Sequence, residues 1–131
     1  MSRAGAVRRV VLLVEDNEKN VKLARDVLEF AGFTVLVATS GEEGVDRARA
    51  SRPDIVLMDL QLPGIDGHTA LARLRADVRT ADIPVVALTA FAMQQDHDRA
   101  TAAGFDGYLT KPISVRQFPD QVRHHLRTEQ P

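Results

Sequence analysis

The sequence contains no cysteine, which excludes disulfides, zinc–thiolate sites and cysteine nucleophiles. It has no excess of charge of one sign: 17 Lys and Arg balance 18 Asp and Glu, for a net charge of −1. This balance argues against a nucleic-acid-binding protein. The longest apolar runs, such as Val10–Val14, are far too short to span a bilayer, and no signal-peptide core follows the start. We therefore expect a cytoplasmic protein with no membrane or nucleic-acid partner.

The 131 residues are enough for one domain with a substantial hydrophobic core. Hydrophobic residues make up 44% of the chain and charged residues 27%, as in ordinary globular proteins. The sequence has no internal repeat, low-complexity segment or interdomain linker. We expect a single domain over residues 8–127, with a flexible tail at 1–7 and another at 128–131.

Short apolar runs alternate with helical segments along the chain. Several of these runs are apolar throughout and rich in valine and isoleucine, which is typical of strands buried on both faces of a parallel sheet. Regular alternation of strands and helices predicts an α/β fold with right-handed crossovers. The predicted strands are Val10–Val14, Phe33–Ala38, Ile55–Met58, Val85–Leu88 and Gly107–Leu109.

Boundary signals mark several of the helices between these strands. Gly32 and Gly104 stand where a helix would end in a left-handed residue. Ser40 with Glu43 has the spacing of a capping box, and Asp66 precedes a helical segment as a cap would. These signals predict the helix ends independently of the apolar pattern.

The sequence also predicts the packing of one helix and the shape of the first turn of another. The segment Asn20–Phe30 has a broad apolar face, including Leu23 and Phe30, and we expect this face to pack on the sheet. Near the end of the chain, Ser114 with Gln117 also matches a capping box. Pro119 follows too closely for a regular helix to start at Ser114, so we expect an irregular first turn.

Polar residues follow the predicted strands. They are Glu15 and Asp16 after the first strand, Asp59 after the third, Thr89 after the fourth, and Thr110 with Lys111 after the fifth. The carboxyl ends of parallel strands share one edge, where ligands bind at the point at which the strand order reverses. Taken singly, each of these residues is more often a turn or cap residue. Their convergence, with complementary chemistry, favours a functional site.

Three carboxylates in one crevice repel each other, and a divalent cation relieves that repulsion. Oxygen ligands without histidine or cysteine favour Mg²⁺, with Mn²⁺ as the alternative. A carboxylate beside such an ion can act as a nucleophile toward phosphorus and form an acyl phosphate. Thr89 and Lys111 are suited to bind phosphoryl oxygens, because phosphoryl transfer needs chiefly positioning and charge neutralisation.

Four segments together resemble the receiver domain of response regulators, the CheY-like superfamily. The resemblance covers about residues 8–127. The segments are Val11–Asn17 (VLLVEDN), Ile55–Gly67 (IVLMDLQLPGIDG), Pro84–Ala90 (PVVALTA) and Tyr108–Pro112 (YLTKP). The family implies a flavodoxin-like, doubly wound (βα)5 fold with strand order 2-1-3-4-5.

The resemblance also implies roles for individual residues. Asp59 matches the phosphoacceptor, Thr89 and Lys111 match the pair that binds the phosphoryl group, and Thr89 with Tyr108 matches the switch. The implied metal ligands are Asp16, Asp59, the backbone carbonyl of Gln61 and, through water, Glu15. The Lys111–Pro112 peptide bond is expected to be cis, which is rare even before proline. The family is not a class of enzymes, since its members catalyse only their own phosphorylation and dephosphorylation.

The family resemblance implies protein partners. A sensor histidine kinase or histidine phosphotransfer protein would dock near Pro112 and Ile113, and a downstream target would contact Tyr108 and Phe91. The sequence pattern alone favours a contact of Phe91 with the hydrophobic core as much as a contact with a partner. The chain is similar both to stand-alone receivers of the DivK type and to receivers within hybrid kinases. Only short tails lie outside the domain, so we expect a stand-alone, monomeric receiver without a DNA-binding domain; the alternative is a receiver fragment of a hybrid kinase.

Two other classes use similar parts. Haloacid-dehalogenase-like phosphatases also combine an aspartate nucleophile with Mg²⁺, Thr and Lys, but they carry a second aspartate two residues later as general acid. Gln61 occupies that position here and is a poor proton donor. A binding-only pseudo-receiver would lack one of the key residues, and none is missing.

Overall fold

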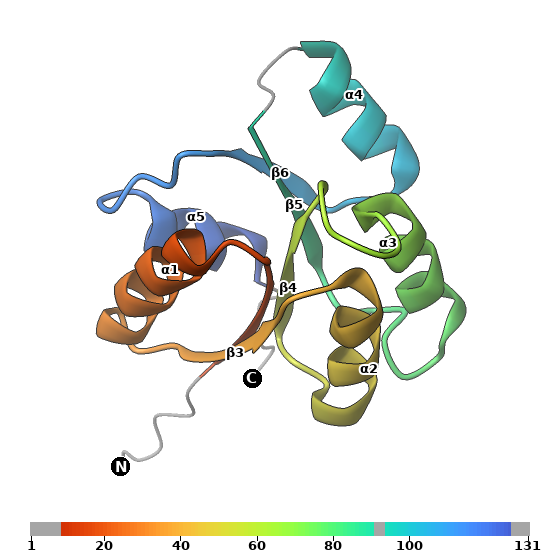
Figure 1. The fold of residues 1–131 in the computed structure, drawn as a ribbon, viewed down its shortest axis with the longest axis horizontal. Helices are drawn as coiled ribbons and strands as arrows, with labels where there is room; N and C mark the ends of the chain where they lie inside the picture. Colours follow the sequence, from red (N-terminus) through yellow and green to blue (C-terminus); the bar gives the residue numbers. More distant parts are fainter. Residues whose placement is uncertain (1–8, 91–93, 127–131) are drawn as a thin grey trace.

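The computed structural model describes residues 9–90 and 94–126. In this part of the chain, strands and helices alternate, and the helices lie on both sides of one sheet (Figure 1). The strands are β2 (Val10–Val14), β3 (Thr34–Ala38), β4 (Ile55–Asp59), β5 (Val85–Thr89) and β6 (Gly107–Thr110). The helices are α1 (Glu18–Phe30), α2 (Gly41–Ser51), α3 (Gly67–Ala76), α4 (Gln94–Ala103) and α5 (Phe118–His125).

The five strands form a parallel sheet in the order β3-β2-β4-β5-β6. In chain order this is 2-1-3-4-5, so the predicted flavodoxin-like fold is confirmed. The order reverses at β2, which pairs with β3 on one side and β4 on the other. The carboxyl ends of β2 and β4 therefore flank the position where such folds bind ligands.

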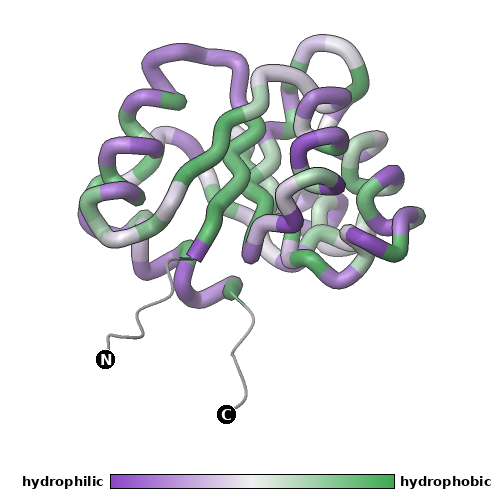
Figure 2. Tube along the Cα trace, turned by 90° about the horizontal axis from the view of Figure 1, so that it is seen from below, coloured by the Kyte–Doolittle hydropathy of each residue, from purple (hydrophilic) through white to green (hydrophobic). Residues whose placement is uncertain are grey.

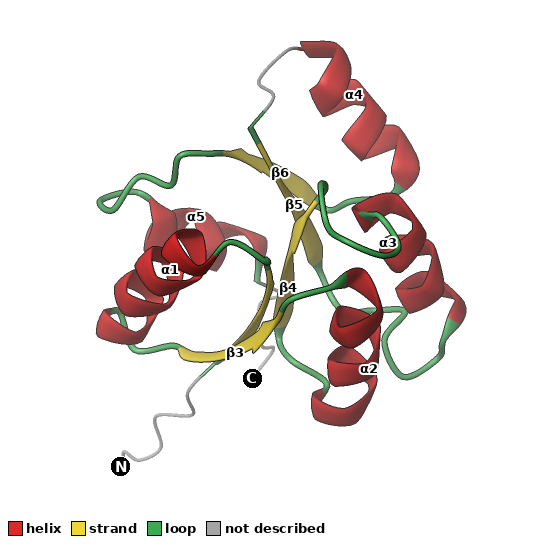
Figure 3. Cartoon of the chain, viewed as in Figure 1, coloured by secondary structure: helices red, strands yellow, loops and turns green. Residues whose placement is uncertain are grey.

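Each face of the sheet carries its own hydrophobic core. Helices α1 and α5 cover one face, and α2, α3 and α4 lie on the other (Figure 3). Alternate residues of one strand serve the two cores: Leu13 packs with Leu28 of α1 and Phe118 of α5, whereas Leu12 packs with Leu71 of α3. This double burial explains why the strands are apolar throughout, as Figure 2 shows for the centre of the molecule.

Most of the predicted boundary signals are confirmed. The Ser40 hydroxyl accepts a hydrogen bond from the Glu43 N–H at 3.1 Å and caps α2, and the Asp66 carboxylate caps α3. Gly32 and Gly104 both have positive φ, at 101° and 104°. This conformation suits glycine at a helix end because a side chain would be strained there.

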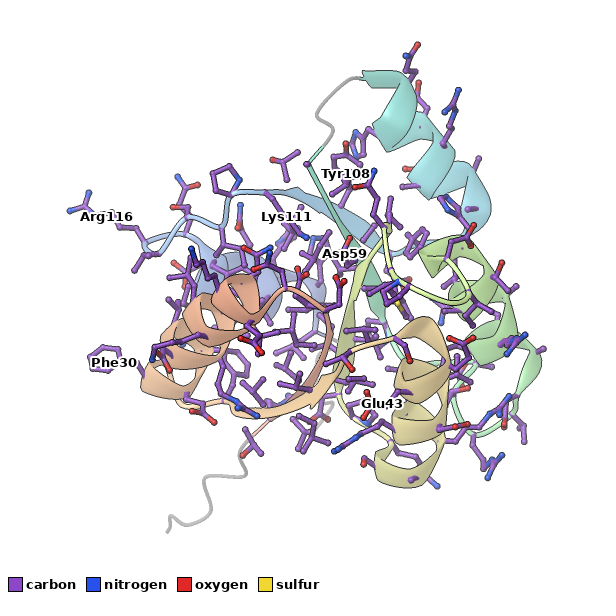
Figure 4. The ribbon with its side chains drawn as sticks, in the orientation of Figure 1. Phe30, Glu43, Asp59, Tyr108, Lys111 and Arg116 are labelled. Carbon is purple, nitrogen blue, oxygen red and sulfur yellow. The ribbon has the colours of Figure 1, made fainter. Side chains whose placement is uncertain are left out.

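Helix α1 differs from the prediction at its start and in the packing of Phe30 and of Leu23, which is 38% exposed. It begins at Glu18, because the Asn17 side chain accepts hydrogen bonds from the N–H groups of Lys19 and Asn20. The prediction that Phe30 packs on the sheet is wrong: Phe30 is 96% exposed, and Figure 4 shows its ring pointing away from the sheet. Two residues beyond buried Leu28, it lies about 200° further around the helix, on the solvent side.

The start of α5 is irregular, as predicted. The Ser114 hydroxyl accepts a hydrogen bond from the Gln117 N–H at 3.3 Å, but this pair closes a turn and does not cap the helix. The regular helix begins at Phe118, with Pro119 in its first turn. Proline is tolerated there because the first N–H groups of a helix have no partner within the helix.

Candidate functional site

Three polar residues are buried at the carboxyl edge of the sheet. Glu15 follows β2, Asp59 ends β4 and Thr89 ends β5, and their exposed fractions are 2%, 4% and 3%. Burying carboxylates in a protein is costly unless charges or hydrogen bonds compensate. The compensation comes from a fourth residue at the same edge.

Lys111, just after β6, contacts both buried carboxylates. Its Nζ lies 2.7 Å from Glu15 Oε1 and 2.8 Å from Asp59 Oδ2. The other oxygen of Asp59, Oδ1, accepts a hydrogen bond from the Gln61 N–H at 2.8 Å. Figure 4 shows Asp59 and Lys111 meeting above the end of the sheet. Residues from β2, β4 and β6 thus form one hydrogen-bonded group.

Asp16 completes an acidic cluster with Glu15 and Asp59. One carboxylate oxygen of each lies within 4.8 Å of the others, and Asp16 is the exposed member. Burial raises the pKa of Glu15, and hydrogen bonds from Lys111 and the Asn17 N–H offset this only in part. Burial also opposes the charge of Lys111, but the hydrogen bonds to Asp59 and Glu15 and the negative charges of these residues together outweigh burial and raise the pKa of Lys111.

The charges of this cluster suit a divalent cation. Three ionised carboxylates and one ammonium leave a charge of −2 in a small, partly buried space. All the nearby donors are oxygens, which Mg²⁺ prefers. Lys111 is paired with both Glu15 and Asp59, whereas Asp16 is the exposed member of the cluster.

The predicted switch residues lie on neighbouring strands. Thr89 and Thr110 pair across β5 and β6, and Tyr108 pairs with Ala87. Tyr108 is half-buried, and its ring lies 4.8 Å from that of His97 in α4, tilted by 45°. The sequence contained no signal for this contact, because His97 is one polar residue of a polar helix.

The predicted partner residues are only partly described. The Lys111–Pro112 bond is cis, as predicted. Pro112 is exposed beside the site, whereas Ile113 is half-buried and packs against the core on the α1 and α5 side. Phe91 lies outside the described residues.

Asn17 is a residue of the site that the prediction missed. Its N–H donates a hydrogen bond to Glu15 Oε2 at 3.1 Å. The sequence signal for it was an Asn immediately before a helix.

Across residues 9–90 and 94–126, none of the helices combines the length and the apolar character that a membrane span requires.

Comparison with known proteins gives a consistent result. The family model for the response regulator receiver domain matches residues 11–123. The polar-differentiation response regulators DivK of Brucella anthropi and Brucella ovis are each 43% identical over 116 residues, which is 88% of this chain and 94% of theirs.

Solved structures agree with the fold. A putative response regulator from Chloroflexus aurantiacus superposes with a TM-score of 0.85 at 31% identity, covering 90% of this chain and 97% of that one. The receiver domain of a sensor histidine kinase from Pseudomonas aeruginosa, solved with a magnesium ion in its active-site cleft, has a TM-score of 0.83 at 33% identity and covers 91% and 98%. The chemotaxis response regulator CheY4 of Vibrio cholerae, at 23% identity, has the same fold with a TM-score of 0.86, covering 92% and 100%.

Proposed function

Because the chain belongs to the response regulator receiver family and serves as a phosphorelay receiver, we propose that Asp59 is the residue that accepts the phosphoryl group. One observation carries the proposal: Asp59 is buried at the switch point of the sheet, bound to Lys111 at 2.8 Å and grouped with two further carboxylates. Glu15 shares these features, and the match of the chain to the receiver family favours Asp59 over Glu15 as the acceptor.

The surrounding residues have complementary roles in this proposal. Asp16, Asp59 and the Gln61 carbonyl would hold Mg²⁺ or Mn²⁺, with Glu15 contributing through water. Such an ion would supply positive charge to offset the carboxylates and the incoming phosphoryl group. The carboxylate of Asp59 attacks phosphorus, and the bond from phosphorus to the donor's nitrogen breaks. The Lys111 ammonium and the Thr89 hydroxyl bind the transferred oxygens, and Thr89 and Tyr108 change packing in response.

The proposed partners follow from the family to which the chain belongs, and Pro112 is exposed beside the site. A sensor histidine kinase or a histidine phosphotransfer protein brings its phosphohistidine to Asp59 past Pro112 and Ile113. A downstream protein contacts Tyr108 and Phe91 and responds to phosphorylation. The proposed unit is a monomeric, cytoplasmic receiver spanning residues 8–127, which catalyses only its own phosphorylation and dephosphorylation and takes no other substrate.

A phosphatase of the haloacid dehalogenase type is the second candidate. It requires a general acid two residues after the nucleophile, where this chain has Gln61. In the structure, the backbone N–H of Gln61 binds Asp59. An amide side chain at this position does not supply the proton that such an enzyme needs. The receiver function therefore has the better support.

Labelling of the protein tests the assignment. Wild-type protein incubated with acetyl phosphate and Mg²⁺ is expected to gain one labile phosphoryl group by intact mass, and Asp59→Asn to gain none. Asp46→Asn, which changes an exposed carboxylate of α2, is the control and should label normally. Equal labelling of Asp59→Asn would disprove the assignment. Continuous phosphate release from many small phosphate esters would instead indicate a phosphatase.

A further inference from the structure

The loop at residues 60–66, between β4 and α3, is attached to the first turn of α2. The Ile65 N–H donates a hydrogen bond to Glu42 Oε1 at 3.3 Å. The same carboxylate lies against the α-carbon of Gly64, where a methyl group would overlap it. Gly64 has a φ of +77°, a conformation that brings the loop backbone onto Glu42.

The first turn of α2 offers a firm base for this attachment. Ser40 caps the helix, and the Glu43 carboxylate accepts a hydrogen bond from the Thr39 N–H at 2.7 Å. Gly41 is buried directly against the loop, since a Cβ there would lie 2.6 Å from the Ile65 carbonyl oxygen. Glu42 therefore extends from a part of α2 that is already fixed in place.

The start of the loop is hydrogen-bonded to Asp59, the proposed phosphoacceptor. The Gln61 N–H donates to Asp59 Oδ1 at 2.8 Å, and the Leu60 N–H donates to the Leu88 carbonyl at 3.1 Å. Gly67, the first residue of α3, is seated so closely that a Cβ would lie 2.9 Å from the Asp59 carbonyl oxygen. Only a few residues separate Ile65 from Gln61, so we expect a shift of the loop near Ile65 to move Gln61 and, with it, the Asp59 carboxylate.

We propose that Glu42 is a positioning residue for the phosphorylation site. By holding Ile65 and Gly64 it fixes the loop whose Gln61 N–H orients the Asp59 carboxylate and whose Gln61 carbonyl is proposed above as a metal ligand. Glu42 is not part of the acidic cluster of Glu15, Asp16 and Asp59 and acts through the loop alone. This inference rests on the function proposed above, and it adds a residue of α2 to the groups on which that function depends.

The test compares three variants. Glu42→Ala removes the hydrogen-bond acceptor, Glu42→Gln removes the charge but keeps an oxygen acceptor, and Asp46→Ala removes an exposed carboxylate of the same helix that does not contact the loop. For each variant, the Mg²⁺ dissociation constant is measured by calorimetry. Exchange of the Ile65 and Gln61 amide hydrogens is measured by NMR in metal-free protein.

We expect Glu42→Ala to speed exchange of the Ile65 and Gln61 amides several-fold and to weaken Mg²⁺ binding by about tenfold, the lower end of the effect of residues that orient metal ligands. Glu42→Gln should stay close to wild type, and so should Asp46→Ala. If Glu42→Gln weakens binding as much as Glu42→Ala, the effect is long-range charge and the positioning role is refuted. Unchanged exchange and binding in Glu42→Ala also refute it, while leaving Asp59 labelling intact. If wild-type protein neither binds Mg²⁺ nor accepts phosphoryl, the proposed function fails, and this inference fails with it.

Discussion

At the residue scale, the charge balance of the site depends on Lys111. Its ammonium contacts Glu15 and Asp59 at once, so one positive charge serves two buried carboxylates while Asp16 lies close by. The site therefore has an excess of negative charge when no metal is bound. Such an excess opposes folding, because the carboxylates repel each other more strongly in a partly buried space than in water.

Substituting Asp59 by Asn should stabilise the metal-free protein. The change lowers the site charge from −2 to −1, and Lys111 keeps its contact with Glu15 at 2.7 Å. The amide oxygen of Asn still accepts the Gln61 N–H. We expect a gain on the order of 1 kcal/mol in unfolding free energy, measured by denaturant titration with a chelator present.

Added Mg²⁺ should then reverse the ranking, because it stabilises only the form that binds it well. Wild-type protein should gain more in melting temperature from Mg²⁺ than Asp59→Asn. A metal-free variant that melts below wild type would contradict the account of charge repulsion.

At the scale of elements, close contacts join α3 to the end of β4. Substituting Gly67 by Ala would place a Cβ 2.9 Å from the Asp59 carbonyl oxygen and 3.0 Å from the Leu60 α-carbon. Both are backbone atoms and cannot rotate away. We expect a loss of about 1–3 kcal/mol in stability and slower labelling by acetyl phosphate. Gly44→Ala is the control: its Cβ meets the Val14 side chain, so labelling should hardly change.

Helix α5 provides a pH-dependent contact with β6. The ring of His125 covers Gly107, where any Cβ would overlap it. Burial lowers the pKa of His125 below its usual 6.5, and neighbouring His124 adds to this, while Asp106 partly opposes it. The unfolded chain therefore binds a proton more readily than the folded one. The stability contributed by neutral His125 is present above pH 6.5 and is lost as the pH falls through the folded pKa.

Wild-type protein should accordingly lose more stability than His125→Gln when the pH falls from about 7.5 to 5.5. The raised pKa of Glu15 acts in the opposite sense, because it favours the folded state in acid, but it is common to both proteins and cancels in the comparison. Melting temperatures at the two pH values provide the measurement. Parallel curves for the two proteins would show that His125 does not titrate on folding.

At the scale of the whole molecule, the sheet separates two cores and connects them to one edge. The α1 and α5 side contributes Leu13 and Leu57, and the other side contributes Leu12 and Met58, from adjacent positions of the same strands. In the proposed function, a change of packing at the carboxyl edge would reach α4 through Tyr108, whose ring contacts His97. Phosphorylation can shift the protein between two such packings only if it lowers the free energy of one packing relative to the other.

Beryllofluoride, a mimic of the phosphoryl group, should produce its largest NMR changes outside the site at Tyr108 and in α4. The ring signals of Tyr108 and His97 should shift together, since the two rings are 4.8 Å apart. The ring of Phe30, exposed at the far end of α1, is the internal reference and should hardly move. Changes concentrated in α1 and α2 would contradict this path.

Much of the fold and the site could be predicted from the sequence. The edge chemistry follows from apolar runs that end at Glu15, Asp59 and Thr89, because parallel strands present their ends together. The strand order was predicted only from the resemblance to the receiver family. Contacts between segments that are far apart in the chain could not be predicted in this way. Nothing in the local pattern pairs Glu42 with Ile65, because that contact exists only once α2 and the loop are docked. Phe30 was misplaced for a local reason: the apolar face was drawn too wide and included a residue about 200° around the helix from buried Leu28.

The position of Lys111 in the chain has a consequence for the protein during its synthesis. The strand made first, β2, occupies an inner place in the sheet, and Lys111 follows the strand made last, 52 residues after Asp59. A nascent chain emerging from the ribosome therefore carries all three carboxylates before the ammonium that joins two of them has been translated. If Asp59 and Lys111 act as proposed, we expect an unfinished chain that ends before Lys111 not to accept the phosphoryl group meant for the finished receiver.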